Sequence, residues 1–365
     1  MALTLHGTVA DNTAVLDRRS AKPLVINGDM QIAQRGTSVT GISGTSLGYK
    51  ACDRWRIDLT GIGEFTAAQT ASAPDNTGLV NSYRLDCTTA ETSPGASEYL
   101  LFSQFYEGQD VQLFKKGTSY AEKMTVAFWV KSNKTGTYVL EVDDNDNSRN
   151  INQAYTISSA NTWEKKVLSF AADTTGTFDN DNANSMRLRW WLAAGSDYTS
   201  GTLQTAWGST VSANRGVGIV NLADSTDNDW SITGIQLEVG EFDANSIAPF
   251  QHESFGDNLR RCERYYKQFG GNSSHERICL VFMATTSQAR GQIPISMRAA
   301  PSIEANNLQI EGTAAVTVNS VAVDQPSARI AAINFNCDTG IAAGQGAQAQ
   351  GANNTSARLK LSAEL

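Results

Sequence analysis

The stretch MRLRWWL, residues 186–192, decides the fold class, because apolar and polar side chains alternate along it with a period of two. One face would carry Met186, Leu188, Trp190 and Leu192, and the other face Arg187, Arg189 and Trp191. Such alternation is typical of a strand that buries one face in a core and presents the other to solvent or to a partner.

Three more runs, residues 124–130, 138–142 and 235–239, repeat this pattern. Their expected core residues are Met124, Val126, Phe128, Val130, Tyr138, Leu140, Val142, Ile235, Leu237 and Val239. Residues 134–137 (KTGT) supply a turn between the first two runs. With 30 glycines and many Ser, Thr, Asn and Asp residues, the chain favours short strands joined by tight turns. We therefore predict an all-β, two-sheet sandwich from residue 24 to about residue 250.

One segment has a helical pattern. SFGD, residues 254–257, resembles a capping box, and the glycines at 270 and 271 would end the helix. Apolar residues follow at helical spacing, namely Leu259, Cys262, Tyr266 and Phe269. We predict a helix over residues 254–269, within a connector segment of residues 254–271 that joins a domain at 24–253 to a domain at 272–365.

Residues 272–365 are rich in Ala, Gly, Asn and Gln, and they form the expected C-terminal tip domain, a small β-sandwich-like unit. The runs expected as strands are 278–283, 292–297, 315–323, 330–335 and 358–361. Residues 340–354 are expected as a low-complexity loop, which is either a receptor contact or plain disorder. Because aliphatic content is low for a self-sufficient domain of this size, we predict that copies share a core in a homotrimer.

Charge and cysteine usage exclude several classes. The net charge of −8 argues against nucleic acid as a partner, and no apolar run is long enough for membrane insertion. The five cysteines are odd in number and form no zinc pattern, so we interpret them as reduced thiols of a chain folded in the cytoplasm.

A series of motifs resembles one family. It begins with NGDMQIAQRGT (27–37) and DRW (53–55), continues through VAFWVKS (126–132) and VNLAD (220–224), and ends in ITGIQLEVG (232–240) and RCERYY (261–266). In this order the motifs resemble bacteriophage and prophage tail-fibre, or receptor-binding, virion proteins with a carbohydrate-binding-module-like jelly roll. The resemblance implies a jelly-roll β-sandwich, a helical connector and a distal domain in trimeric fibres. It does not carry over a glycan specificity.

Catalytic motifs are absent from the sequence. None of the three histidines lies in a nucleophile or metal pattern, and no phosphate loop occurs. Two carboxylates would suffice for a glycosidase, but acidic residues are too numerous for sequence to choose a pair. We predict that the protein is not an enzyme.

Glycan binding needs an aromatic platform and planar polar groups for the hydroxyls. The outward face of 186–192 offers both, and two aromatics follow in a loop-rich stretch. The glycan-binding candidates are therefore Arg187, Arg189, Trp191, Tyr198 and Trp207. In the alternative, Trp191 packs under a loop or a subunit interface. DRW at 53–55 is best interpreted as a structural turn with a buried tryptophan and an ion pair.

Metal binding has weaker support. The acidic loops at 143–147, 179–182 and 224–229 cluster oxygen ligands, which suits calcium, yet none matches an EF-hand, and solvated loop tips explain them as well. Carbohydrate-binding jelly rolls often hold a structural calcium, and Asp29 and Glu238 lie in the matching segments. They are weak calcium candidates, and no other cofactor is expected.

Residues 1–23 are polar, end in a basic run, and are expected to anchor the chain to phage tail or collar proteins; composition alone fits a frayed terminus equally well. The leading hypothesis is a homotrimeric virion fibre, assembled in the host cytoplasm, that attaches to host surface polysaccharide. The alternative is a purely structural collar or head-decoration fibre without a host ligand.

Overall fold

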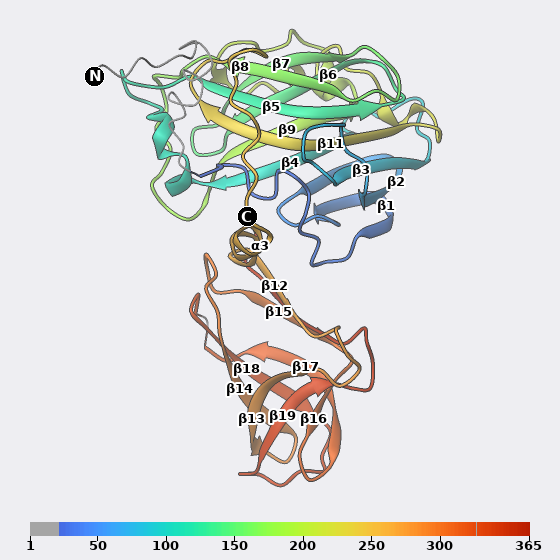
Figure 1. Ribbon diagram of the computed structural model, residues 1–365, viewed down its shortest axis with the longest axis vertical. Coiled ribbons are helices and arrows are strands. Elements are labelled where there is room, and N and C mark those ends of the chain that lie inside the picture. Colours follow the sequence, from blue (N-terminus) through green and yellow to red (C-terminus); the bar gives the residue numbers. More distant parts are fainter. Residues whose placement is uncertain (1–21, 326) are drawn as a thin grey trace, which may run out of the picture. The chain divides into compact units, whose positions relative to one another are not determined.

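The computed structural model describes residues 22–325 and 327–365 (Figure 1). Most of the predicted anchoring segment at 1–23 therefore lies outside the described residues. The chain divides into two compact units, of which the first ends at Phe255 and the second begins at Gly256.

The first unit is built almost entirely from antiparallel strands. Its strands are β1 (Ser38–Tyr49), β2 (Arg56–Thr70), β3 (Ser82–Thr89), β4 (Tyr99–Glu107), β5 (Met124–Ser132), β6 (Gly136–Asp144), β7 (Arg149–Ile157), β8 (Glu164–Phe170), β9 (Asn184–Ala194), β10 (Gly208–Ser209) and β11 (Asp229–Val239). The helices in its described residues are the single turn α2 (Ser196–Thr199) and the 3-10 segments η2 (Gly108–Asp110), η3 (Gln112–Phe114), η4 (Ser212–Asn214) and η5 (Leu222–Asp224).

These strands form one long curled sheet in the order β10-β7-β6-β9-β4-β2-β3-β11-β5-β8, with β1 paired to β2. The path folds over so that β7 lies beside β8, which gives two layers around one core. Aromatic rings fill its centre: the rings of Trp55 and Phe102 stack at 4.7 Å, and Trp190 meets both edge-on. The predicted all-β jelly roll is confirmed.

The period-two assignments hold in all four runs, whose expected core residues are all buried. The turn expected between the first two runs does not make a hairpin, however. β5 pairs with β11 and β8, whereas β6 pairs with β7 and β9. The chain at 133–135 therefore crosses from one layer to the other, a connection that alternation within each strand does not reveal.

Two segments that are far apart in the sequence meet at Gly28 and Ile235. The backbone N–H of Ile235 donates to the carbonyl of Gly28 at 3.0 Å, and a Cβ on Gly28 would lie 2.3 Å from the carbonyl oxygen of Ile235. Nearby, the indole N–H of Trp55 donates to the carbonyl of Asn27 at 2.9 Å, and Asp53 pairs with Arg35 at 3.4 Å. The expected structural turn with a buried tryptophan and an ion pair is the arrangement found.

The second unit begins with a helix and continues in short strands. Its elements are α3 (Phe255–Glu263), β12 (Tyr266–Phe269), β13 (Arg277–Thr285), β14 (Gln288–Pro294), β15 (Ser302–Asn306), β16 (Leu308–Glu311), β17 (Ala315–Val323), β18 (Ile330–Cys337), β19 (Gly346–Gly351) and β20 (Arg358–Ser362). Six strands close a barrel in the order β13-β14-β18-β17-β16-β19, and β12-β20-β15 form a separate sheet. The tip is thus a small closed barrel with an added sheet, rather than an open sandwich. No helix in the described ranges is long and apolar enough to cross a membrane.

Two predictions about this unit are wrong in detail. The helix ends at Glu263, and Tyr266–Phe269 instead forms β12, which pairs with β20. Tyr266 is buried in the second unit, as the helical pattern predicted, but it is buried from strand β12 and not from a helix. The expected loop at 340–354 contains β19, which bridges β13 and β16 and closes the barrel. Small residues suit this place because Gly351 has backbone within 2.6 Å of where a Cβ would lie.

Candidate functional site

The outer face of the layer β7-β6-β9-β4-β2 carries a dense set of charged side chains. Strand register places Arg189 opposite Glu141 on β6 and opposite Ser103 on β4, and Arg187 opposite Asp143 and Phe105. The charged residues of this face are Arg56, Asp58, Glu141, Asp143, Arg187 and Arg189, and Arg215 reaches the face from the loop after β10. We call these seven residues the recess.

Trp191 lies on the same face but is covered. Its ring is 1% exposed, with the ring of Tyr198 at 5.2 Å and the guanidinium of Arg215 at 5.1 Å. A Cβ on Gly216 would lie 3.3 Å from the ring. The expectation of an open aromatic platform at Trp191 is therefore wrong, and the alternative, packing under a loop, is the arrangement found. The reason is the segment 195–219, which folds back over this part of the sheet.

Glu141 anchors that covering segment. Its two carboxylate oxygens accept hydrogen bonds from Nε and Nη2 of Arg215, both at 2.8 Å, from Nδ2 of Asn150 at 2.9 Å and from Nε1 of Trp191 at 3.0 Å. Burial alone would raise the pKa of Glu141, but the charges of Arg215 and Arg189 outweigh it and hold that pKa below its ordinary value. Its acceptor positions are fully used, so Glu141 is a structural anion.

Asp143 is held more loosely, two residues further along the same strand face. It faces Nη1 of Arg187 at 3.3 Å and Nη1 of Arg189 at 3.5 Å. Burial raises the pKa of Asp143, and the Glu141 charge adds to this, against the opposing effect of the arginines. The two carboxyl groups of β6 therefore have pKa values displaced in opposite directions.

A row of guanidinium groups and aromatic rings borders the recess. Phe105 has the guanidinium carbons of Arg187 and Arg56 at 4.9 and 5.2 Å from its ring centroid. Arg56 also lies 5.9 Å from the ring of Tyr49 on β1, and its Nε donates to Asp58 at 2.7 Å. Rings stacked in this way hold the guanidinium planes in place and leave their edges for hydrogen bonding.

Arg189 differs from the other arginines of the recess. Within the described chain its guanidinium makes no hydrogen bond, although the side chain is only 12% exposed and its Nε is buried. The hydroxyl of Ser103, directly opposite on β4, is also buried without a hydrogen-bond partner. Buried donors are almost always paired in native structures, so these two neighbouring groups are exceptions that lack an acceptor within the described chain.

Tyr198 and Trp207 do not share one surface. Tyr198, on α2, packs against Trp191 and Tyr99 at the covered end of the recess. The indole N–H of Trp207 donates to the carbonyl of Ala171 at 2.7 Å, and the Lys116 ammonium lies 4.9 Å from its ring. Trp207 thus belongs to a buried ionic cluster outside the recess, in which Lys116 pairs with Asp144 at 2.5 Å and with Asp173 at 3.0 Å.

The weak calcium candidates Asp29 and Glu238 are both buried. Burial raises the pKa of Asp29. Among residues 22–325 and 327–365, no group of three or more His, Cys, Asp or Glu side chains is placed to hold a metal ion. The acidic loop at 143–147 is used otherwise: Asp144 pairs with Lys116, and Asn145 accepts from Arg187.

Several residues of the recess were missed from the sequence. Glu141 and Asp143 alternate with apolar residues in 138–142 and beyond, so their shared face could have been found from the same period that placed Arg187 and Arg189. The position of Arg215 could not be predicted in this way, because it depends on the course of the irregular segment 195–219. Ser103 and Phe105 lie beside the recess, and predicting their position would have required knowledge that β4 pairs with β9.

Comparison with known proteins finds likeness at the level of structure. A tailspike domain of bacteriophage CBA120, described as enzymatically active, matches with a TM-score of 0.30 and 14% identity over 56% of this chain and 21% of that chain. A family 11 carbohydrate-binding module of a Clostridium thermocellum cellulase matches with a TM-score of 0.28 and 8% identity, over 55% of this chain and 97% of that chain. A family 4 carbohydrate-binding module gives a TM-score of 0.28 and 10% identity, over 58% and 97%. No family model and no curated protein matches the sequence.

Proposed function

We propose that this protein is a fibre component of a bacteriophage virion, and that the recess of its jelly roll binds glycan on the host cell surface. The observation that carries the binding proposal is the buried Nε of Arg189, which has no hydrogen-bond partner, beside the hydroxyl of Ser103, which also has none. Sugar hydroxyls and carboxylates supply the acceptors that these donors lack.

The virion assignment rests on the ordered series of motifs in the sequence. Gly28 of the first motif and Ile235 of a late one are in direct backbone contact, which supports reading these two motifs as parts of one structural element. We further propose that three copies assemble into the fibre and that residues 1–23 attach it to tail or collar proteins. Several weak contacts would then act together through effective concentration.

Binding without catalysis is the mechanism we propose. A retaining or inverting glycosidase needs two carboxyl groups that can exchange protons or attack a sugar. Glu141 cannot serve, because four donors occupy its oxygens. The two other carboxyl groups of the recess are each held by arginines, Asp58 by Arg56 at 2.7 Å, and Asp143 by Arg187 and Arg189 at 3.3 and 3.5 Å.

The test is a polysaccharide array with the full chain. Arg189→Met keeps the apolar stem and removes the guanidinium, and we expect at least about a tenfold loss of affinity for the polysaccharide that the wild type binds, as for a lost charged hydrogen bond. Ser103→Ala should also weaken binding while leaving the free energy of unfolding unchanged or higher, because the hydroxyl makes no bond to lose. Arg84→Met is the matched control, since Arg84 pairs with Asp86 and Asp229 outside the recess. Equal binding by all four proteins would refute the recess as the site.

A further inference from the structure

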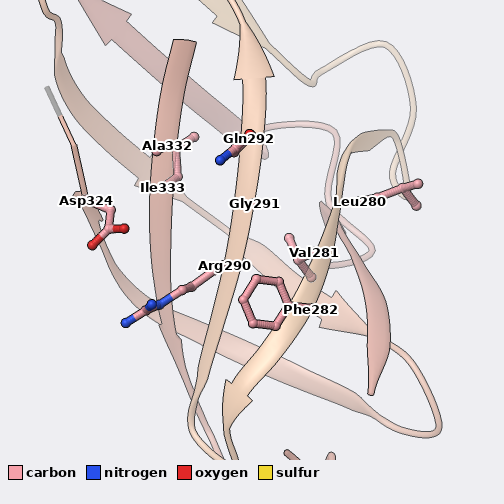
Figure 2. A pocket seen from close by; sticks show the side chains of 9 residues that line it. All are labelled: Leu280, Val281, Phe282, Arg290, Gly291, Gln292, Asp324, Ala332 and Ile333. Carbon is pink, nitrogen blue, oxygen red and sulfur yellow. The ribbon is translucent and has the colours of Figure 1, made fainter. Parts of the chain in front are cut away.

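The barrel of the second unit has a pocket of about 400 Å³ on its outer surface, where β13, β14 and β18 lie side by side with the end of β17 (Figure 2). This volume is in the range typical of small-molecule sites. Its lining residues are Leu280, Val281, Phe282, Arg290, Gly291, Gln292, Asp324, Ala332 and Ile333. None of them lies in the motifs, between residues 27 and 266, on which the proposed function rests.

Phe282 gives this pocket an open aromatic ring. The residue is 52% exposed, and its neighbour on the same strand face, Leu280, is 80% exposed. Register places Phe282 directly opposite Arg290 on the neighbouring strand. The guanidinium of Arg290 extends away from the ring, to the side of the pocket on which Asp324 lies (Figure 2). The first unit offers no such platform in its recess, where Trp191 and Phe105 are both buried.

Polar groups with unused hydrogen-bonding capacity surround the ring. In the part of the chain that the structure describes, the side chains of Arg290 and Gln292 make no hydrogen bond or ion pair. One oxygen of Asp324 accepts from Nδ2 of Asn334 at 3.0 Å, while the amide oxygen of Asn334 is buried without a partner. Donors, an acceptor and a flat apolar surface therefore line one pocket.

We propose that this pocket binds an uncharged sugar unit, as a second glycan site that rests on the proposed function and adds to it. The C–H face of the ring would stack on Phe282, and hydroxyls would bond to Arg290, Gln292 and Asp324. An uncharged ligand fits best, because Arg290 and Asp324 balance each other. A second copy of this chain fits less well, because aspartate is depleted at protein interfaces and Asp324 lines this opening.

The experiment compares full-length variants at Phe282 on the same polysaccharide array and, for each bound polysaccharide, measures affinity for its oligosaccharides by calorimetry. Phe282→Leu keeps an apolar side chain without a flat ring and should weaken binding about tenfold. Phe282→Trp should retain or improve binding. Tyr120→Ala, which removes an exposed aromatic ring outside both sites, is the control and should change nothing.

Each outcome discriminates. If the wild type binds polysaccharide and Phe282→Leu binds it equally well, the second site is refuted while the proposed function stands. If no polysaccharide binds the wild type, the proposed function itself fails. If Phe282→Leu instead lowers the sedimentation coefficient, the face is a contact between copies and the sugar proposal is overturned.

Discussion

Replacing Arg215 by methionine tests how the recess is held together. The change keeps an apolar stem over Trp191 but removes two hydrogen bonds of 2.8 Å and the only cation that contacts both oxygens of Glu141 within the described structure. Breaking a buried ion pair by removing one partner costs about 3–5 kcal/mol. Because Asn150 and Trp191 still donate to Glu141, we expect a loss at the lower end, about 3 kcal/mol at pH 7.

The pH dependence provides a specific signature. In the wild type, the lowered pKa of Glu141 contributes stability above its ordinary pKa, and this is lost only as pH falls through the lowered value. In Arg215→Met the effect of burial should outweigh the remaining favourable interactions, so the pKa of Glu141 should lie above its ordinary value. Protonation of Glu141 should then remove the cost of the buried charge in the variant. The difference in the free energy of unfolding between the wild type and Arg215→Met should therefore shrink as pH falls from 7 to about 5.

Urea unfolding followed by tryptophan fluorescence measures this cleanly, because all seven tryptophans lie between residues 55 and 230, inside the jelly roll. Arg84→Met, which loses two partly exposed ion pairs, should cost less than about 1 kcal/mol. A deficit below about 1 kcal/mol in Arg215→Met, or one that does not change with pH, would refute the reasoning.

Two more changes probe the scaffold by the same unfolding assay. Lys116→Met leaves Asp144 and Asp173 buried without their shared cation and should cost about 3–5 kcal/mol; a cost below about 1 kcal/mol would show that the cluster is not energetically coupled. Gly28→Ala forces a Cβ against the carbonyl of Ile235 and should lower the free energy of unfolding by about 1–3 kcal/mol. Gly256→Ala is the control, because a Cβ there meets open space, and it should leave the stability of the jelly roll unchanged. Equal stability of the two variants would contradict the close contact between Gly28 and Ile235.

Much of the fold could be predicted from period-two alternation. Residues 186–192 show why: four apolar side chains lie in the core, and the intervening ones project from the other face. The same period failed where composition hid a strand. β19 consists of small and polar residues, so its sequence shows no alternating apolar face. It is a strand because it pairs with β13 and β16.

The candidate site could be predicted only in part. Alternation placed Arg187 and Arg189 on the correct face, but whether Trp191 is open depends on the segment 195–219, whose course is set by Arg215 and Glu141 across the sheet. The open ring at Phe282 was missed because exposure on a barrel depends on closure, which brings β13 beside β19 and β14. The exposure of Trp191 and of Phe282 depends on contacts between segments distant in the sequence, and a local sequence pattern carries no information about those contacts.

The most direct measurement of the central claim is a crystal structure of the full chain with an oligosaccharide from a polysaccharide that it binds. We expect sugar density in the recess, with sugar oxygens within hydrogen-bond distance of Arg189. Sugar bound elsewhere on the jelly roll, with Nε of Arg189 still without a hydrogen-bond partner, would contradict this expectation.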